Sequence, residues 1–122
     1  RKNFQSAVEV ALLARKPGEV IHWGGGGVTP NHFKAPIAAG NDRTDHPTQK
    51  PLSLMRHLVK ILSPPGGRVL DPFCGSGTTL VASLLEGRSA EGFDLSEDYC
   101  SIARDRIEEW ERSNEMLQMP LL

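Results

Sequence analysis

Residues 71–79 read Asp71-Pro72-Phe73-Cys74-Gly75-Ser76-Gly77-Thr78-Thr79, and the fold can be predicted from them outward. The apolar run Arg68-Val69-Leu70 leads into it, and a helical pattern from Leu80 to Glu86 leads out of it. A buried strand, a glycine turn and a helix N-terminus in this order form a nucleotide-binding corner of an α/β sheet. Gly75 and Gly77 can take positive φ and leave room for a ligand close to the backbone. The stretch therefore predicts a cofactor site.

Three classes of ligand use such a turn, and the residues favour one of them. A Walker-type phosphate loop needs a lysine after the glycines, and none follows here. The dinucleotide fingerprint would put the bulky Leu80 where helix and strand must pack closely, and it would put Asp71 beside a pyrophosphate. A cofactor with an amino acid moiety and a positive sulfonium suits Asp71 better. We therefore expect S-adenosylmethionine as the cofactor.

The other elements follow from apolar periodicity and from residues that begin or end helices. Pro51 suits the start of one helix, Gly87 suits the C′ position of the next, and Ser96 suits the N-cap of the last. Asp94, at the end of a second strand, can accept hydrogen bonds from ribose hydroxyls. The two strands around the glycine turn are expected to be parallel. The strands expected on this basis are residues 68–71 and 89–94, and the expected helices are residues 51–62, 78–86 and 97–112.

These residues resemble the amino-methylating DNA methyltransferases, which act on N6 of adenine or N4 of cytosine with S-adenosylmethionine. The order of the motifs is similar to the permuted group of this family, whose cofactor-binding half is C-terminal. Asp94 stands where glutamate is commoner in that group. The resemblance implies an α/β fold, with part of a Rossmann-like methyltransferase sheet and flanking helices. It also implies a third strand of this sheet at residues 8–15, because residues 3–16 resemble a strand of the family. It is carried by the glycine turn, by Ala14-Arg15-Lys16, by His46-Pro47-Thr48-Gln49-Lys50-Pro51 and by Gly92-Phe93-Asp94-Leu95-Ser96-Glu97-Asp98-Tyr99.

The resemblance also implies which residues bind the cofactor. Asp94 would hold the ribose, and Leu95 would lie against the adenine. Lys50 would be a charge partner of the cofactor's carboxylate, which Thr48 and Gln49 would also approach. The residues that would line the methionine end are Asp71, Phe73, Gly75, Ser76, Gly77 and Thr78.

The sequence departs from the family at the catalytic motif. Amino-methylation needs an (Asp/Asn/Ser)-Pro-Pro-aromatic tetrapeptide, which holds the target amino group in line with the sulfonium methyl group. The single Pro-Pro of this chain lies in Ser63-Pro64-Pro65-Gly66, where glycine takes the place of the aromatic residue. Pro-Pro-Gly-Gly is typical of a connecting turn. We therefore expect no catalytic residue in this chain.

Four regions are expected along the 122 residues, which suffice for one domain. They are a strand and hairpin region (1–22), a Gly/Pro-rich loop (23–45), the S-adenosylmethionine-binding region (46–112) and a C-terminal tail (113–122). The permuted group carries its catalytic strand upstream of Arg1, so the simplest interpretation is a C-terminal piece of a larger protein. The alternative is a subunit whose catalytic segment is a partner chain. A sheet without its central neighbours would expose an edge, and a homodimer would not be surprising.

Composition excludes several classes of protein. A net charge of −1 is not that of a basic nucleic-acid binder. Double-stranded DNA is therefore expected only as a partner of the complete enzyme, as the resemblance implies. Two cysteines without CxxC spacing predict free thiols and fit a cytoplasmic location. The four histidines share no ligand spacing, so no metal site is expected. No apolar stretch approaches the length of a membrane span.

Two functional hypotheses remain open at this level. In the first, the chain is the cofactor-binding part of a site-specific DNA methyltransferase of the restriction-modification or phage type. In the second, it is a catalytically inactive methylase-like module for binding or interaction. The neighbours of Cys74 do not support cytosine C5 chemistry, which needs a cysteine nucleophile. Whether adenine or cytosine is the target is not decided by the residues.

Overall fold

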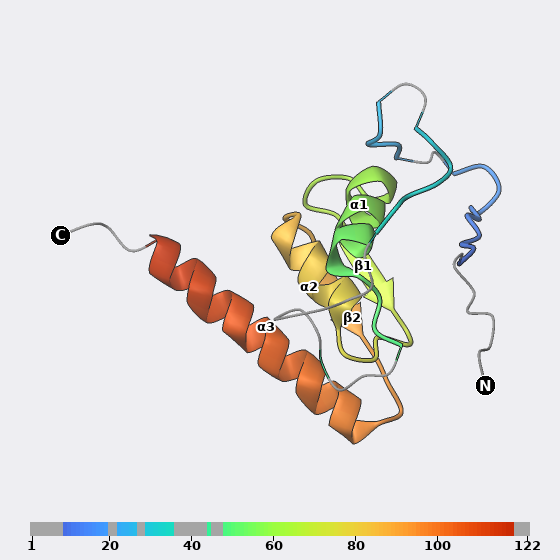
Figure 1. Cartoon of the computed structure of the whole chain (residues 1–122). Coiled ribbons are helices and arrows are strands. Elements are labelled where there is room, and N and C mark those ends of the chain that lie inside the picture. The colour runs from blue at the N-terminus through green and yellow to red at the C-terminus, as the bar shows by residue number, and fades with distance from the viewer. Residues whose placement is uncertain (1–8, 20–21, 27–28, 36–43, 45–47, 119–122) are drawn as a thin grey trace.

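A computed structural model of the chain describes residues 9–19, 22–26, 29–35, 44 and 48–118. The elements are α1 (Leu52–Leu62), β1 (Arg68–Asp71), α2 (Thr78–Leu85), β2 (Ser89–Gly92) and α3 (Glu97–Gln118). Figure 1 shows α2 between α1 and α3, with the two strands beside it. This arrangement makes α2 the central element, because it contacts both other helices and both strands.

The two strands are parallel, as the sequence predicts. Arg68 lies opposite Ser89, and Asp71 lies opposite Gly92. Backbone hydrogen bonds continue beyond β2: Phe93 N–H donates to the Asp71 carbonyl at 3.0 Å, and Cys74 N–H donates to the Phe93 carbonyl at 2.9 Å. The carboxyl ends of both strands therefore stay joined at the place where the glycine turn begins.

The core of the described residues is small and lies around α2. This helix buries Leu80, Val81 and Ala82. Its sequence is apolar on most sides, which suits a helix that packs against both other helices and both strands. The facing side of α1 contributes Val59 and Ile61, and α3 contributes Ala103 to the same core. Other apolar residues remain exposed, among them Leu70 in the middle of β1, which is 62% exposed. The sheet is thus only partly covered by the elements that the structure describes.

The helix ends confirm several predictions from the sequence. Gly87 follows α2 with a φ of 72°, and its N–H donates to the Leu84 carbonyl at 3.0 Å, as expected of a C′ glycine. Ser96 caps α3, since its hydroxyl accepts a hydrogen bond from Tyr99 N–H at 3.3 Å. Pro51 occupies the N-cap position of α1, one residue before the helix begins. Each signal is local, which is why the sequence alone could reveal it.

Two elements differ from the prediction. The described part of the expected strand, residues 9–15, forms no strand, and Leu12 in it is 95% exposed. The segment has no neighbour to pair with among the described residues, because the described sheet contains β1 and β2 alone, and a strand needs such a partner. The last helix runs to Gln118, so residues 113–118 are helical instead of belonging to a tail. The polar face of α3 continues through those residues without a glycine or proline to end the helix.

Residues 22–35, in their described parts, form no regular element and lie against α1. Gly24 N–H donates to the Ile61 carbonyl at 2.8 Å, and the ring of Phe33 stacks on His57 with 4.6 Å between ring centroids. The described parts of the expected Gly/Pro-rich loop thus contain no helix or strand. Within the described part of the chain, no helix has both the length and the apolar character needed to cross a membrane.

Candidate functional site

The glycine turn between β1 and α2 is stabilised by hydrogen bonds among its own residues. Asp71, the last residue of β1, accepts a hydrogen bond on Oδ1 from Phe73 N–H at 3.0 Å, and this contact starts the turn. Gly77 N–H donates to the Cys74 carbonyl at 2.8 Å, and the φ of Gly77 is 76°. That conformation strains any residue with a Cβ, so the sequence needs glycine there.

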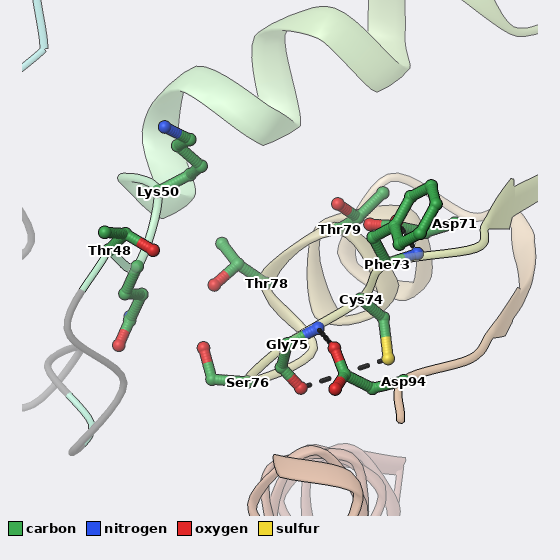
Figure 2. Close-up of a pocket in the computed structure, with 11 residues that line it drawn as sticks. Thr48, Lys50, Asp71, Phe73, Cys74, Gly75, Ser76, Thr78, Thr79 and Asp94 are labelled. Atoms are coloured by element: carbon green, nitrogen blue, oxygen red, sulfur yellow. Dashed lines mark hydrogen bonds between the residues drawn. The ribbon is translucent and has the colours of Figure 1, made fainter. Parts of the chain in front are cut away.

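Asp94 joins the end of β2 to this turn. Its Oδ2 accepts a hydrogen bond from Gly75 N–H at 2.9 Å, and its Oδ1 accepts one from Ser96 N–H at 2.9 Å. Figure 2 shows the carboxylate beside Gly75, with the bond between them drawn. An ionised carboxylate has about four acceptor positions, so it can bond to several donors at once. Asp94 thus holds the turn in place through Gly75.

A hollow of about 190 Å³ lies at the carboxyl ends of the strands. In Figure 2 the segment before α1 faces the glycine turn across this space. Of the eleven predicted cofactor residues, the hollow gathers nine, and it adds Cys74 and Thr79. The predicted residues that line it are Thr48, Gln49, Lys50, Asp71, Phe73, Gly75, Ser76, Thr78 and Asp94.

Two lining residues that precede Pro51 and α1, Gln49 and Lys50, have partners of their own in this structure. Gln49 Oε1 accepts hydrogen bonds from the backbone N–H and the hydroxyl of Thr44, at 2.8 and 2.7 Å. The Lys50 ammonium pairs with Glu9 at 2.6 Å, in an exposed ion pair that contributes little to stability. Such a pair is readily exchanged for another anion. Lys50 is therefore near the hollow with a charge that a ligand carboxylate could take over.

Two predicted residues do not line the hollow. Gly77 is buried below it, where an added Cβ would lie 2.8 Å from the Ala103 Cβ. Leu95 is fully exposed beyond the end of β2. Phe73 does line the hollow, but its side chain remains 83% exposed. The role of Gly77 here is close packing against α3, while contact of Leu95 or Phe73 with a ligand stays a prediction.

Arg106, on α3, is a site residue that the sequence analysis missed. Its Nη1 donates to the Ser76 carbonyl at 2.8 Å and to Thr78 Oγ1 at 3.0 Å, so it reaches the turn from a helix far along the chain. No motif signals this contact, since an arginine at helical spacing usually reads as part of a solvated face. Only the packing of α3 on α2 brings it to the turn.

Cys74 lies in the turn but has the character of an inert thiol. Burial raises its pKa, and the negative charges of Asp71 and Asp94 raise it further. A nucleophilic cysteine needs the opposite shift, because the thiolate is the reactive form. The structure thus agrees with the interpretation that cytosine C5 chemistry does not occur here. Cys74 and Cys100 are both free cysteines.

The Pro-Pro sequence forms the connection between α1 and β1. Gly67 N–H donates to the Pro64 carbonyl at 2.9 Å, and Gly66 has a φ of 70°, both of which belong to a tight turn. The interpretation of this segment as a connecting turn is confirmed. It does not line the hollow described above.

Comparison with known families gives the chain its place. A family profile described as DNA methylase, of the N6/N4 class, matches residues 1–105. The chain therefore belongs to this family of DNA methylases, and the resemblance seen in the sequence is confirmed.

Curated relatives are longer than this chain. The Type II methyltransferase M.ScaI of Streptomyces caespitosus is 43% identical over 67 residues, which cover 55% of this chain and 22% of the relative. The Type II methyltransferase M.BglI of Bacillus subtilis is 33% identical over 115 residues, which cover 84% of this chain and 31% of the relative. The chain thus spans between about a fifth and a third of the length of these relatives.

Solved structures confirm the fold class. The crystal structure of M1.HpyAVI in complex with SAM superposes with a TM-score of 0.62 at 31% identity, covering 74% of this chain and 45% of that one. The cytosine-N4-specific PvuII DNA methyltransferase gives a TM-score of 0.59 at 24% identity, covering 64% of this chain and 31% of that one. The second likeness concerns the fold alone. The predicted α/β methyltransferase fold is therefore confirmed.

Proposed function

We propose that this chain is the S-adenosylmethionine-binding part of a site-specific DNA methyltransferase that acts on N6 of adenine or N4 of cytosine. The observation that carries the proposal is the hollow itself. Residues from three separate segments, at Thr48–Lys50, Asp71–Thr79 and Asp94, meet there at the carboxyl ends of two parallel strands. This is the place where open α/β sheets bind their ligands.

The charges of the hollow suit this cofactor. Asp71 and Asp94 offer carboxylates to a sulfonium, an amino group and ribose hydroxyls, while Lys50 offers a cation to a carboxylate. The N-terminus of α2 adds backbone donors that favour an anionic group nearby. When bound, S-adenosylmethionine would supply the electrophilic methyl group, and the residues named here would bind and orient it.

The hollow is small for a complete cofactor site. Ligand pockets commonly measure about 300–1,000 Å³, and this one measures about 190 Å³. We attribute the difference to a wall supplied by another segment, either upstream in the same protein or on a partner chain. The same segment would carry the Pro-Pro-aromatic tetrapeptide, and double-stranded DNA would be the substrate of the complete enzyme. The free thiols of the chain fit the reducing cytoplasm.

Calorimetry with S-adenosylmethionine tests the cofactor site. Asp71→Ala and Asp94→Ala should each weaken binding by about 1–3 kcal/mol, or roughly 5- to 150-fold in Kd, through the loss of charge-assisted hydrogen bonds. Glu91→Ala is the matched control. Glu91 is an exposed acid of β2, three residues before Asp94, and it pairs with Arg68 outside the hollow. Unchanged affinity in both aspartate variants would remove the assigned site.

Methyl transfer tests the division of labour. Residues 1–122 alone should not methylate DNA, because their single Pro-Pro segment has glycine in place of the aromatic residue and does not line the hollow. Addition of the catalytic segment, in cis or as a separate chain, should give transfer of a radiolabelled methyl group to an exocyclic amine. Robust transfer by residues 1–122 alone would refute the proposal. Cofactor binding without restored transfer would instead favour an inactive binding module.

A further inference from the structure

Arg106 connects the C-terminal helix to the glycine turn through three hydrogen bonds. Its Nη1 donates to the Ser76 carbonyl at 2.8 Å, to Thr78 Oγ1 at 3.0 Å and to Ser76 Oγ at 3.4 Å. The two bonded residues are among the most buried polar residues described, with 3% and 5% exposure. Buried acceptors of this kind need a donor, and the one that reaches them comes from α3.

The contact matters because its acceptors belong to the hollow. Ser76 and Thr78 both line it. Gly75, the residue before Ser76, donates a backbone hydrogen bond to Asp94. Two charged side chains thus hold the turn by hydrogen bonds, the Asp94 carboxylate after β2 and the Arg106 guanidinium on α3. Both hydrogen bonds are charge-assisted, which makes each stronger than a bond between neutral groups.

We propose that Arg106 is a positioning residue for cofactor binding: it fixes the Ser76–Thr78 part of the glycine turn in the conformation that receives S-adenosylmethionine. The proposal rests on the proposed function for the identity of the ligand, but the effect on the turn is a property of this chain alone. It also gives α3 a role in the site, although the helix supplies no lining residue to the hollow.

Arginine suits this role better than lysine would. The planar guanidinium presents donors in fixed directions, whereas an ammonium on a flexible stem behaves as a point charge. Arg104, on the same helix, offers a matched contrast. It pairs with Glu97 at 2.9 Å on the surface, its side chain is 61% exposed, and it makes no contact with the turn.

The experiment compares Arg106→Met, Arg106→Lys and Arg104→Met in the full chain. Hydrogen exchange of individual backbone amides reports on the turn without any ligand. In Arg106→Met, the Gly75 and Gly77 amides should exchange about tenfold faster or more, while the Phe93 amide of the strand pairing should not change. Arg106→Lys should be intermediate, and it covers the case in which the methionine variant does not fold. Arg104→Met should match the unaltered chain.

Calorimetry on the same proteins gives the second readout. The Kd for S-adenosylmethionine should rise about tenfold or more in Arg106→Met at a temperature where every variant is folded, and it should stay unchanged in Arg104→Met. Equal acceleration of exchange throughout the chain would mean that Arg106 only docks α3, and this would overturn the proposal. So would unchanged exchange in the turn. Faster exchange in the turn of a chain that binds no S-adenosylmethionine would uphold the positioning of the turn and refute the proposed function.

Discussion

Gly77→Ala is the substitution that most directly tests how the turn and α3 fit together. Gly77 has a φ of 76°, and a Cβ added to it would lie 2.8 Å from the Cβ and 3.1 Å from the Cα of Ala103. Carbon atoms without a bond between them prefer separations of about 3.5–4.0 Å. The alanine would therefore be strained twice, once by its own backbone and once by the packing of α3.

The two costs can be estimated separately. A left-handed conformation costs an alanine about 1–2 kcal/mol, and the insertion of a methyl group into close packing costs about 1–3 kcal/mol. The sum predicts a loss of about 2–5 kcal/mol in the free energy of unfolding, which would be a large share of the stability of a small domain. The backbone part can be measured on its own at Gly87, which has a φ of 72° and open space around its missing Cβ.

Urea denaturation followed by circular dichroism measures both variants. Gly87→Ala should lose about 1–2 kcal/mol, from the backbone term alone. The difference between Gly77→Ala and Gly87→Ala should then be about 1–3 kcal/mol, since the gain from a stiffer unfolded chain is common to both and cancels. A Gly77→Ala variant that is no less stable than Gly87→Ala would refute the close packing of Ala103 on the turn.

Two further predictions concern Arg88 and Cys74. Arg88 is buried and donates to the Ser63 carbonyl at 2.7 Å, so Arg88→Met should lower the free energy of unfolding by about 1.5–3 kcal/mol, whereas Arg68→Met, at an exposed ion pair, should cost under about 1 kcal/mol; equal losses by urea denaturation would contradict this. Because burial and two aspartates raise the pKa of Cys74, its alkylation by iodoacetamide in a Cys100→Ser background should keep rising with pH above about 8.5. A rate that levels off below that pH would show a lowered pKa instead.

The local signals of the sequence predicted the two strands, the turn and the helix ends that form the hollow. The strand, the glycine turn and the cap residues Ser96 and Gly87 each depend on neighbours within a few positions, so their patterns are visible in the chain itself. The spacing of Asp71 and Asp94 at the ends of two parallel strands follows from the same local elements. Their meeting in one hollow could therefore be expected before any coordinates were known.

The contacts of α3 could not be predicted in the same way. Arg106 and Ala103 reach the turn only because α3 crosses α2 at a particular angle and depth, which no pattern in the sequence encodes. The periodicity of α3 predicted which face is apolar but not which arginine would leave the solvent. The position of Gly77 below the hollow, instead of on its wall, has the same origin.

The strand expected at residues 8–15 is absent from residues 9–15, the part of it that the structure describes. The resemblance to the family predicts the strand, yet the apolar residues Val10 and Leu12 are almost fully exposed in the described part of the segment. The hydrogen bonds of a strand come from a neighbouring chain segment, and none pairs with residues 9–15 among the described residues. β1 and β2 pair with each other, and Leu70 in β1 also remains exposed. Apolar residues of both segments are thus exposed to solvent in the described part of the chain. Their exposure supports the proposal that further strands of the sheet come from a segment outside this chain.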